Sequence, residues 1–224
     1  MMESDCRPFE DVKSGEVPVR GHLHVTATSS RDGIVLTHSA GANCDSPLLV
    51  AIANSFCKAG LTVLRCDLPF RQLRPHGPPP RGSAERDQRG LRRAVEALRR
   101  QLPGRVFLGG HSYGGRQTSM LAASEPGLVD ALLLLSYPLH PPKAPKQLRT
   151  AHFSDLRTPA LFVHGTRDAF GAIDEMKAAL KLIPPRTQLV PVEGTGHELM
   201  SARNRSTLPD VIADAFAGFI AAHA

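Results

Sequence analysis

Short apolar runs alternate with amphipathic helical patterns along most of this 224-residue chain. The runs expected to form strands cover residues 17–28, 33–38, 61–66, 105–108, 131–135, 160–164 and 188–192. The helical patterns between and after them cover residues 47–59, 83–102, 112–125, 173–182 and 208–222. Strands that alternate with helices are typical of a parallel sheet, since each helix carries the chain back to the start of the next strand. We therefore predict an α/β fold with a mostly parallel central sheet flanked by helices.

The whole chain is predicted to form one domain. Its length suffices for one sizeable buried core, and no linker or internal repeat divides it. We expect a single domain over residues 1–224, in which residues 1–15 are a loosely ordered N-terminal segment. Residues 71–82 are rich in proline and are expected to be irregular, because proline is excluded from helix interiors and central strands.

Composition excludes several other classes of protein. The longest apolar run, residues 131–135, is far shorter than the roughly 20 residues that a membrane-spanning helix needs. The first residues are acidic and polar rather than signal-like, so we expect no membrane partner and a cytoplasmic location. The four cysteines form no Cys-x-x-Cys pair and no zinc-like spacing with histidine, so we expect reduced thiols and no metal site.

A net charge of +6 raises the alternative of a nucleic-acid partner. The basic residues concentrate between positions 65 and 105, and many lie on the polar face of the predicted helix 83–102. The chain has no tryptophan and only two tyrosines for base stacking, and no nucleic-acid motif accompanies the charge. We interpret this face as solvated and do not expect nucleic-acid binding.

The strongest local motif is the G-x-S-x-G pattern at residues 110–114. An apolar strand enters it and a helical pattern leaves it, as a nucleophile elbow requires. Such a turn lifts the hydroxyl of Ser112 above the carboxyl end of the sheet. It also directs the backbone N–H of Tyr113 to the place where negative charge develops on a reacting carbonyl, next to a helix N-terminus that favours this charge.

A serine nucleophile needs a base, and the base needs an acid to orient it. In the elbow-containing fold these partners follow the serine in the order acid, then histidine, on loops after later strands. Asp168 follows the strand 160–164, and His197 follows the strand 188–192. We therefore predict a catalytic triad of Ser112, Asp168 and His197, with Asp174 as the nearest alternative acid.

The second donor of the oxyanion hole is expected in the loop after the strand 33–38, whose small residues leave room for a substrate oxygen. We assign it to the backbone N–H of Ala40, with Ser39 as the alternative. His38 is expected to stabilise this loop by a hydrogen bond, and His111 to pack beside the elbow. The candidates for the substrate pocket are His38, His111, Pro69, Phe70 and Tyr137.

These motifs together resemble the α/β-hydrolase superfamily along nearly the whole chain. More narrowly, residues 36–41, 108–116, 136–140 and 159–168 resemble the KANL3/Tex30-type hydrolase-like family, which is close in architecture to dienelactone hydrolases. Animal relatives of this type usually carry Arg in place of His111 and Met in place of Tyr113. Many relatives insert a helical cap after the strand 131–135, but the proline-rich connection here is too short for one, so we expect an open site.

The predicted function is therefore acyl transfer by a carboxylesterase-like or thioesterase-like serine hydrolase that acts on a small ester or thioester. The expected partner is a small-molecule acyl substrate, no cofactor is required, and the chain is expected to be a monomer or a homodimer. Basic residues near the site, Arg71, Arg74 and Lys143, suggest an anionic acyl substrate. The alternative function is a non-catalytic module of the same fold that binds other proteins.

Overall fold

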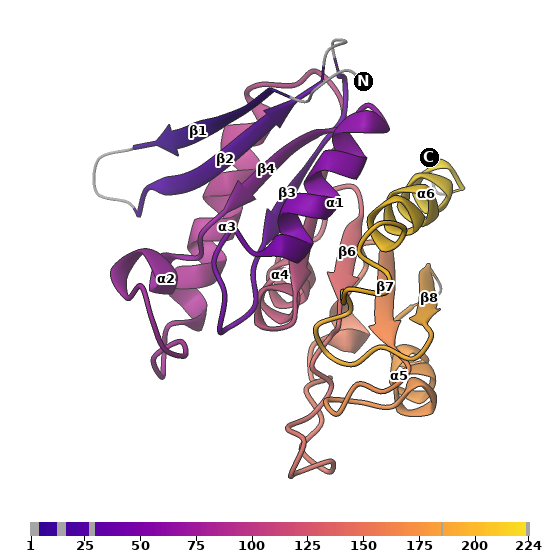
Figure 1. Ribbon diagram of the computed structural model, residues 1–224. Helices are drawn as coiled ribbons and strands as arrows, with labels where there is room; N and C mark the ends of the chain where they lie inside the picture. The colour runs from indigo at the N-terminus through magenta and orange to yellow at the C-terminus, as the bar shows by residue number, and fades with distance from the viewer. Residues whose placement is uncertain (1–4, 13–16, 27–29, 185, 223–224) are drawn as a thin grey trace.

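The computed structural model describes residues 5–12, 17–26, 30–184 and 186–222, which contain one eight-stranded sheet (Figure 1). The strand order is β1-β2-β4-β3-β5-β6-β7-β8. The strands are β1 (Asp5–Asp11), β2 (Val19–Val25), β3 (Gly33–Thr37), β4 (Thr62–Cys66), β5 (Val106–His111), β6 (Leu132–Leu135), β7 (Ala160–Gly165) and β8 (Thr187–Val192). The strands from β3 onward run parallel, whereas β2 pairs antiparallel with both β1 and β4.

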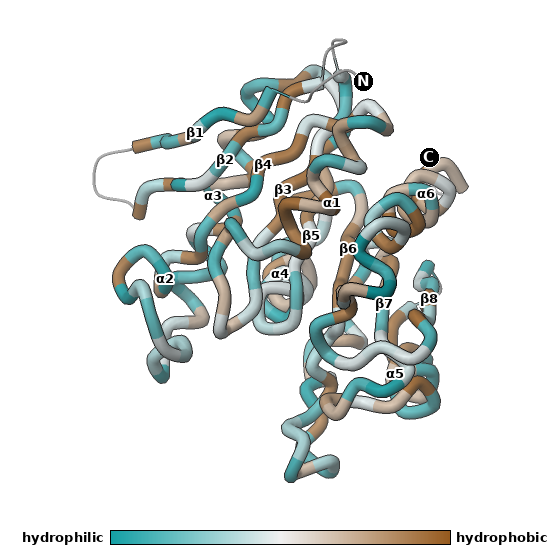
Figure 2. Tube along the Cα trace, in the orientation of Figure 1, coloured by the Kyte–Doolittle hydropathy of each residue, from teal (hydrophilic) through white to brown (hydrophobic). Residues whose placement is uncertain are grey.

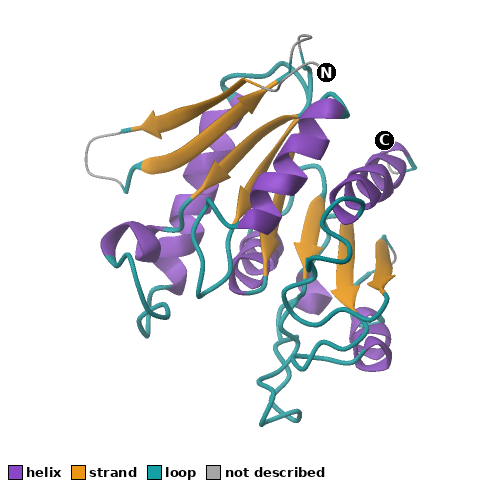
Figure 3. Ribbon diagram, in the orientation of Figure 1, coloured by secondary structure: helices purple, strands orange, loops and turns teal. Residues whose placement is uncertain are grey.

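Helices cover both faces of this sheet, as Figure 3 shows. They are α1 (Pro47–Lys58), α2 (Pro69–Leu73), α3 (Ala84–Arg99), α4 (Tyr113–Ser124), α5 (Ile173–Leu180) and α6 (Leu208–Ala221). Side chains of α1 and α6 join one apolar cluster, and side chains of α3, α4 and α5 join the other. Successive strand residues point to opposite faces, so in β3 the side chains of Ile34 and Leu36 enter the first cluster and that of Val35 enters the second.

The central strands are buried on both faces and therefore read as continuous apolar runs. Every residue of β3, β4, β5, β6 and β7 is buried, which explains why the sequence located β3, β4, β6 and β7 within one residue; β5 extends three residues beyond its predicted end, through Gly109 and Gly110 to His111. In the hydropathy colouring of Figure 2, much of β3, β5 and β6 has the brown of apolar residues. The predicted α/β-hydrolase architecture is confirmed.

Two elements differ from the sequence-based expectation. Asp5–Asp11 forms strand β1 instead of a loosely ordered segment, and its pairing with β2 supplies the order. Most of β1 is exposed, so its sequence lacks the apolar pattern of a strand; residues 1–4 and 13–16 lie outside the described part. The segment expected to be irregular begins within the short helix α2, which Pro69 starts at its first position.

The connection between β6 and β7 contains only a 3₁₀ turn, Phe153–Asp155, and no cap, as expected. It leaves the carboxyl end of the sheet at Ser136 and returns to β7. Within the described residues, no helix has both the length and the apolar character of a bilayer span.

Candidate active site

The nucleophile elbow lies where β5 turns into α4. Ser112 has φ 53° and ψ −113°, a backbone conformation that a residue with a Cβ rarely adopts. The adjacent glycines allow the close approach that the turn needs. A Cβ on Gly110 would lie 2.5 Å from the carbonyl carbon of Gly114, and a Cβ on Gly114 would lie 2.5 Å from the carbonyl oxygen of His38.

Three side chains from separate loops form one chain of hydrogen bonds at the carboxyl end of the sheet. The Nε2 atom of His197 is 2.7 Å from Ser112 Oγ, and its Nδ1 atom is 2.8 Å from Asp168 Oδ2. An ionised carboxylate only accepts, so Nδ1 of a neutral imidazole donates to Asp168 and Nε2 accepts the hydroxyl proton of Ser112. The structure thus brings together the three residues that the sequence singled out.

Asp168 is fixed by backbone as well as by His197. Its side chain is fully buried, and its Oδ1 accepts the N–H of Phe170 at 2.8 Å. Burial opposes ionisation of this carboxyl, but the hydrogen bonds from His197 and Phe170 outweigh it and keep the pKa of Asp168 below its ordinary value. Asp168 therefore both shapes its turn and faces the histidine.

Two neighbours hold His197 in place. The ring of Phe170 stacks on the imidazole with 4.1 Å between centroids. The Nε2 atom of His111 lies 3.0 Å from the carbonyl oxygen of His197, within donating distance. Burial lowers the pKa of His111, so its imidazole is neutral and acts as a packing and anchoring group. Phe170 carries no motif of its own, although its position two residues after Asp168 was a usable signal.

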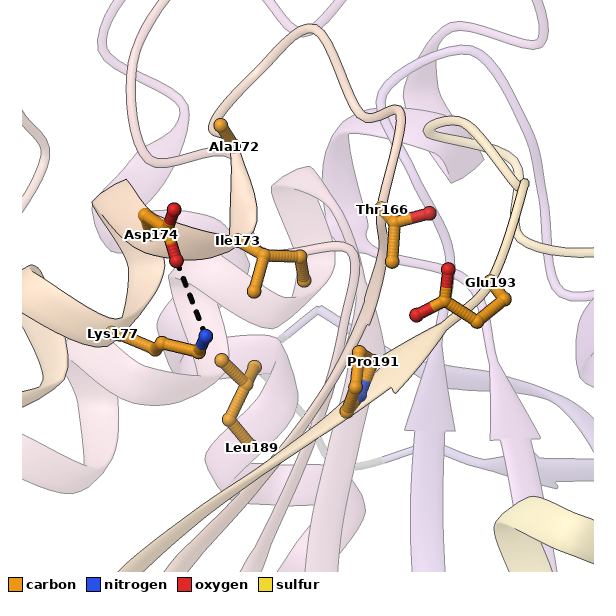
Figure 4. A pocket seen from close by; sticks show the side chains of 8 residues that line it. All are labelled: Thr166, Ala172, Ile173, Asp174, Lys177, Leu189, Pro191 and Glu193. Atoms are coloured by element: carbon orange, nitrogen blue, oxygen red, sulfur yellow. Dashed lines mark hydrogen bonds and ion pairs between the residues drawn. The ribbon is translucent and has the colours of Figure 1, made fainter.

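The alternative acid, Asp174, lies elsewhere. It is on α5, its side chain is 93% exposed, and it forms an ion pair with Lys177 at 3.2 Å. Figure 4 shows this pair at the edge of a cavity of about 410 Å³ between α5 and β8, which Thr166 and Glu193 also line. Asp174 has no contact with His197 in this arrangement, whereas Asp168 does.

The loop after β3 approaches the elbow from the other side. His38 is buried; its Nε2 accepts the N–H of Leu68 at 3.0 Å, and its Nδ1 donates to the carbonyl of Ser39 at 2.8 Å. Burial lowers the pKa of His38, which agrees with a neutral ring that both donates and accepts. Within the described residues, the N–H groups of Ser39, Ala40 and Tyr113 donate to no backbone carbonyl. They remain available to an oxyanion.

The side chain of Tyr113 points away from the reacting centre and anchors the elbow. Its hydroxyl donates to Oδ2 of Asp87 at 2.7 Å, and Oδ1 of the same carboxyl accepts the N–H of Phe70 at 2.9 Å. Asp87 is completely buried, and burial raises its pKa. No sequence motif points to this link, because Asp87 reads as one more charged residue on a solvated helix.

The expected pocket residues belong to the interior instead. Tyr137 has no exposed surface, packs against Phe153 and Phe162, and donates its hydroxyl proton to the carbonyl of Arg149 at 2.6 Å. Pro69, Phe70 and His38 are likewise buried. The sequence does not distinguish an aromatic residue of a pocket from one of the core beneath it.

Arg71 also has a different role from the one expected. It is 5% exposed, and all five of its hydrogen bonds go to backbone carbonyls, those of Ala40, Ala42, Arg74, Pro75 and Gly77. It therefore joins the loop after β3 to the proline-rich segment after α2. Its donors are already occupied, so Arg71 is not available to an anionic substrate.

One group of potential metal ligands lies outside this site. Atoms of His22, Cys44 and Asp45 lie within 4.8 Å of one another. The guanidinium of Arg65 reaches the same place, since its Nη1 is 3.1 Å from Asp45 Oδ1. Burial also raises the pKa of the Cys44 thiol. A protonated thiol beside a guanidinium is a poor cation site, so these residues do not fit a metal.

Comparisons with known proteins agree with this fold. A family model described as an alpha/beta hydrolase domain matches residues 30–223. The dienelactone hydrolase from Anabaena variabilis is 23% identical with a TM-score of 0.73, over 94% of this chain and 98% of that chain. Est1E from Butyrivibrio proteoclasticus is 16% identical with a TM-score of 0.75, over 96% of this chain and 99% of that chain.

A protein of Xanthomonas campestris, XC6422, is described as a serine hydrolase without lid. It is 17% identical with a TM-score of 0.72, over 98% of this chain and 97% of that chain. At these identities the likeness concerns the fold. The family model covers nearly the entire described chain, and the chain therefore belongs to the alpha/beta hydrolase domain family.

Proposed function

We propose that this protein is a serine hydrolase that cleaves a small ester or thioester by acyl transfer. The observation that carries the proposal is the continuous hydrogen-bonded chain from Ser112 through His197 to Asp168, with links of 2.7 and 2.8 Å. The nucleophile and base are already within hydrogen-bonding distance, which is the geometry that covalent catalysis by serine needs.

The reaction proceeds in two halves. In the first, Ser112 Oγ attacks the substrate carbonyl while His197 Nε2 takes its proton, and Asp168 stabilises the imidazolium that forms. His197 then protonates the leaving alcohol or thiol, which departs and leaves an acyl group on Ser112. In the second half, His197 takes a proton from water while the water oxygen attacks the acyl carbonyl. As the tetrahedral intermediate collapses, His197 returns this proton to Ser112 Oγ, and the acid is released.

The oxyanion of each tetrahedral intermediate is assigned to the backbone N–H of Tyr113 and to that of Ala40, with Ser39 as the alternative. The unused donors of these residues support the assignment. The carbonyl of Ala40 accepts a hydrogen bond from Arg71 Nη2 at 2.7 Å, which orients the peptide plane of this loop. Fixed donors of this kind stabilise developing charge without reorganisation.

The same proposal covers the finer features of the activity. We assign a carboxylesterase-like or thioesterase-like specificity, a small-molecule acyl substrate, no cofactor, and membership of the KANL3/Tex30-type branch. We also propose a cytoplasmic location and a monomeric or homodimeric state. The names of two similar structures, a dienelactone hydrolase and a serine hydrolase without lid, support the reaction class.

Labelling with a fluorophosphonate probe, followed by mass spectrometry of the modified peptide, tests this function. We expect the label on Ser112, none in Ser112→Ala, and a large loss of labelling rate in His197→Ala. For 4-nitrophenyl acetate, either substitution is expected to lower kcat/KM by at least about 10³-fold. The exposed Ser201→Ala variant serves as the matched control and is expected to react like the wild type.

Absence of labelling in folded wild-type protein would overturn the proposal. It would favour the alternative function, a non-catalytic module that binds other proteins. Circular dichroism of each variant separates this outcome from a failure to fold.

A further inference from the structure

A group of basic side chains lies beside the elbow, where α4 faces the connection between β6 and β7. Arg116 belongs to α4, and Arg149 and His152 belong to the connection. The His152 ring reaches α4 directly, since its Nε2 is 2.8 Å from Ser119 Oγ. All three basic side chains are partly exposed, so a ligand from solvent can reach them.

Arg116 lacks the partners that a guanidinium normally has. Its Nε is buried and has no hydrogen-bond partner in the structure. None of the arginine–carboxylate ion pairs between described residues includes Arg116 or Arg149. A buried charged donor without a partner is rare in native proteins, and it marks a place where a ligand or ordered water completes the hydrogen bonding.

The charge of Arg116 acts on its basic neighbours. Burial, followed by the charge of Arg116, lowers the pKa of His152 to about 4, and Asp155 acts in the opposite direction. The same two causes act in the same order to lower the pKa of Arg149. The positive charge of Arg116 therefore acts on both His152 and Arg149, and an anion placed among the three side chains would relieve the repulsion between their charges.

Arg116 lies one helical turn after the nucleophile. The N–H of Arg116 donates to the carbonyl of Ser112 at 2.9 Å, as expected for residues four positions apart in a helix. Side chains in helices lean toward the N-terminus, so the guanidinium of Arg116 leans toward the end of α4 that carries Ser112. Arg71, whose donors are all occupied, has no such freedom.

We propose that Arg116 and Arg149 form an anion subsite that binds a carboxylate carried by the ester substrate. This inference rests on the proposed function for its substrate, and the bidentate geometry of a guanidinium suits a carboxylate. The carboxylate belongs either to the acyl part or to the alcohol part of the ester. Two pairs of substrates distinguish these two positions of the carboxylate. The two members of each pair are similar in carbon skeleton and differ in charge.

The acyl pair is 4-nitrophenyl hydrogen glutarate against 4-nitrophenyl pentanoate. The alcohol pair is the butyrate ester of 4-hydroxybenzoate against that of 4-hydroxybenzamide. In one pair, wild-type kcat/KM for the charged member is expected to exceed that for the neutral member by about tenfold, the effect of one charge-assisted contact. Arg116→Gln is expected to bring this ratio close to one, whereas the exposed Arg89→Gln on α3 keeps it.

Calorimetric titration with glutarate at low ionic strength supplies a readout that needs no turnover. Wild-type protein is expected to bind glutarate saturably, and Arg116→Gln to bind it at least about tenfold more weakly. Either of two results would overturn the subsite and leave the hydrolase. One is a preference for the charged substrate that survives in Arg116→Gln. The other is equal kcat/KM for the charged and the neutral member in both pairs, together with no binding of glutarate. Arg116-dependent glutarate binding without turnover of any ester would overturn the proposed function and retain the subsite.

Discussion

At the scale of single residues, Arg71 joins two loops. These loops have no regular structure, so their backbone carbonyls accept hydrogen bonds from Arg71 instead. Replacing it with methionine keeps much of the side-chain volume but removes five hydrogen bonds. We expect Arg71→Met to lower the free energy of unfolding by about 2–5 kcal/mol, because five backbone carbonyls lose their donor. Urea denaturation measures this loss. The exposed Arg74→Met is the control, and an equal effect of both substitutions would contradict the role of Arg71.

Two histidines, the buried His24 and the partly exposed His152, give the stability of the protein a defined pH dependence. Burial, followed by nearby arginines, lowers the pKa of His24 and that of His152 from 6.5 to about 4. Between these values each of the two histidines binds a proton in the unfolded chain but not in the folded chain. The two histidines therefore lower stability as the pH decreases from about 6.5 to about 4, and their effect levels off below. We expect the fall to be smaller in His152→Gln, as measured by urea midpoints at pH 7 and 4.5. Parallel curves would argue against this prediction.

At the scale of elements, two helical glycines should respond in opposite ways to the same substitution. A Cβ on Gly114 in α4 would lie 2.5 Å from the His38 carbonyl oxygen, whereas a Cβ on Gly218 in α6 would meet nothing within 4 Å. Gly114→Ala is expected to destabilise the protein by about 1–3 kcal/mol, because α4 must move away from the loop after β3. Gly218→Ala is expected to stabilise it by about 0.5–1 kcal/mol, since alanine favours the helix. Thermal unfolding of both variants checks the difference in sign.

Elements with strong local signals were predictable from sequence. Strand β6 is four consecutive buried leucines, and the order of Ser112, Asp168 and His197 after successive strands identified a candidate triad. Strand β1 was missed because its residues are mostly exposed and its order depends on pairing with β2.

The supporting contacts of the site were also beyond sequence reasoning. Asp87 contacts Tyr113 across 26 positions, and Arg71 contacts Ala40 across 31. Such pairs leave no periodic pattern, because the three-dimensional fold alone decides which distant residues meet. For the same reason, the aromatic ring of Tyr137 could not be assigned to the core rather than to a pocket.

At the scale of the whole molecule, the sheet gathers Ser112, Asp168 and His197 at one end, and the short connection between β6 and β7 leaves that end without a cap. Enzymes with mobile lids often have turnover limited by opening and closing on the microsecond-to-millisecond timescale. In the part of the chain that the structure describes, no helical cap covers this end of the sheet. Substrate encounter and acylation should therefore follow each other directly.

Stopped-flow kinetics with 4-nitrophenyl acetate would reveal this behaviour. We expect a burst of nitrophenol without a preceding lag, because no conformational step has to come before attack by Ser112. A lag whose length does not change with substrate concentration would indicate a hidden gating step. Without a gate, discrimination between substrates depends on fixed contacts at the open mouth and not on closure around the bound molecule.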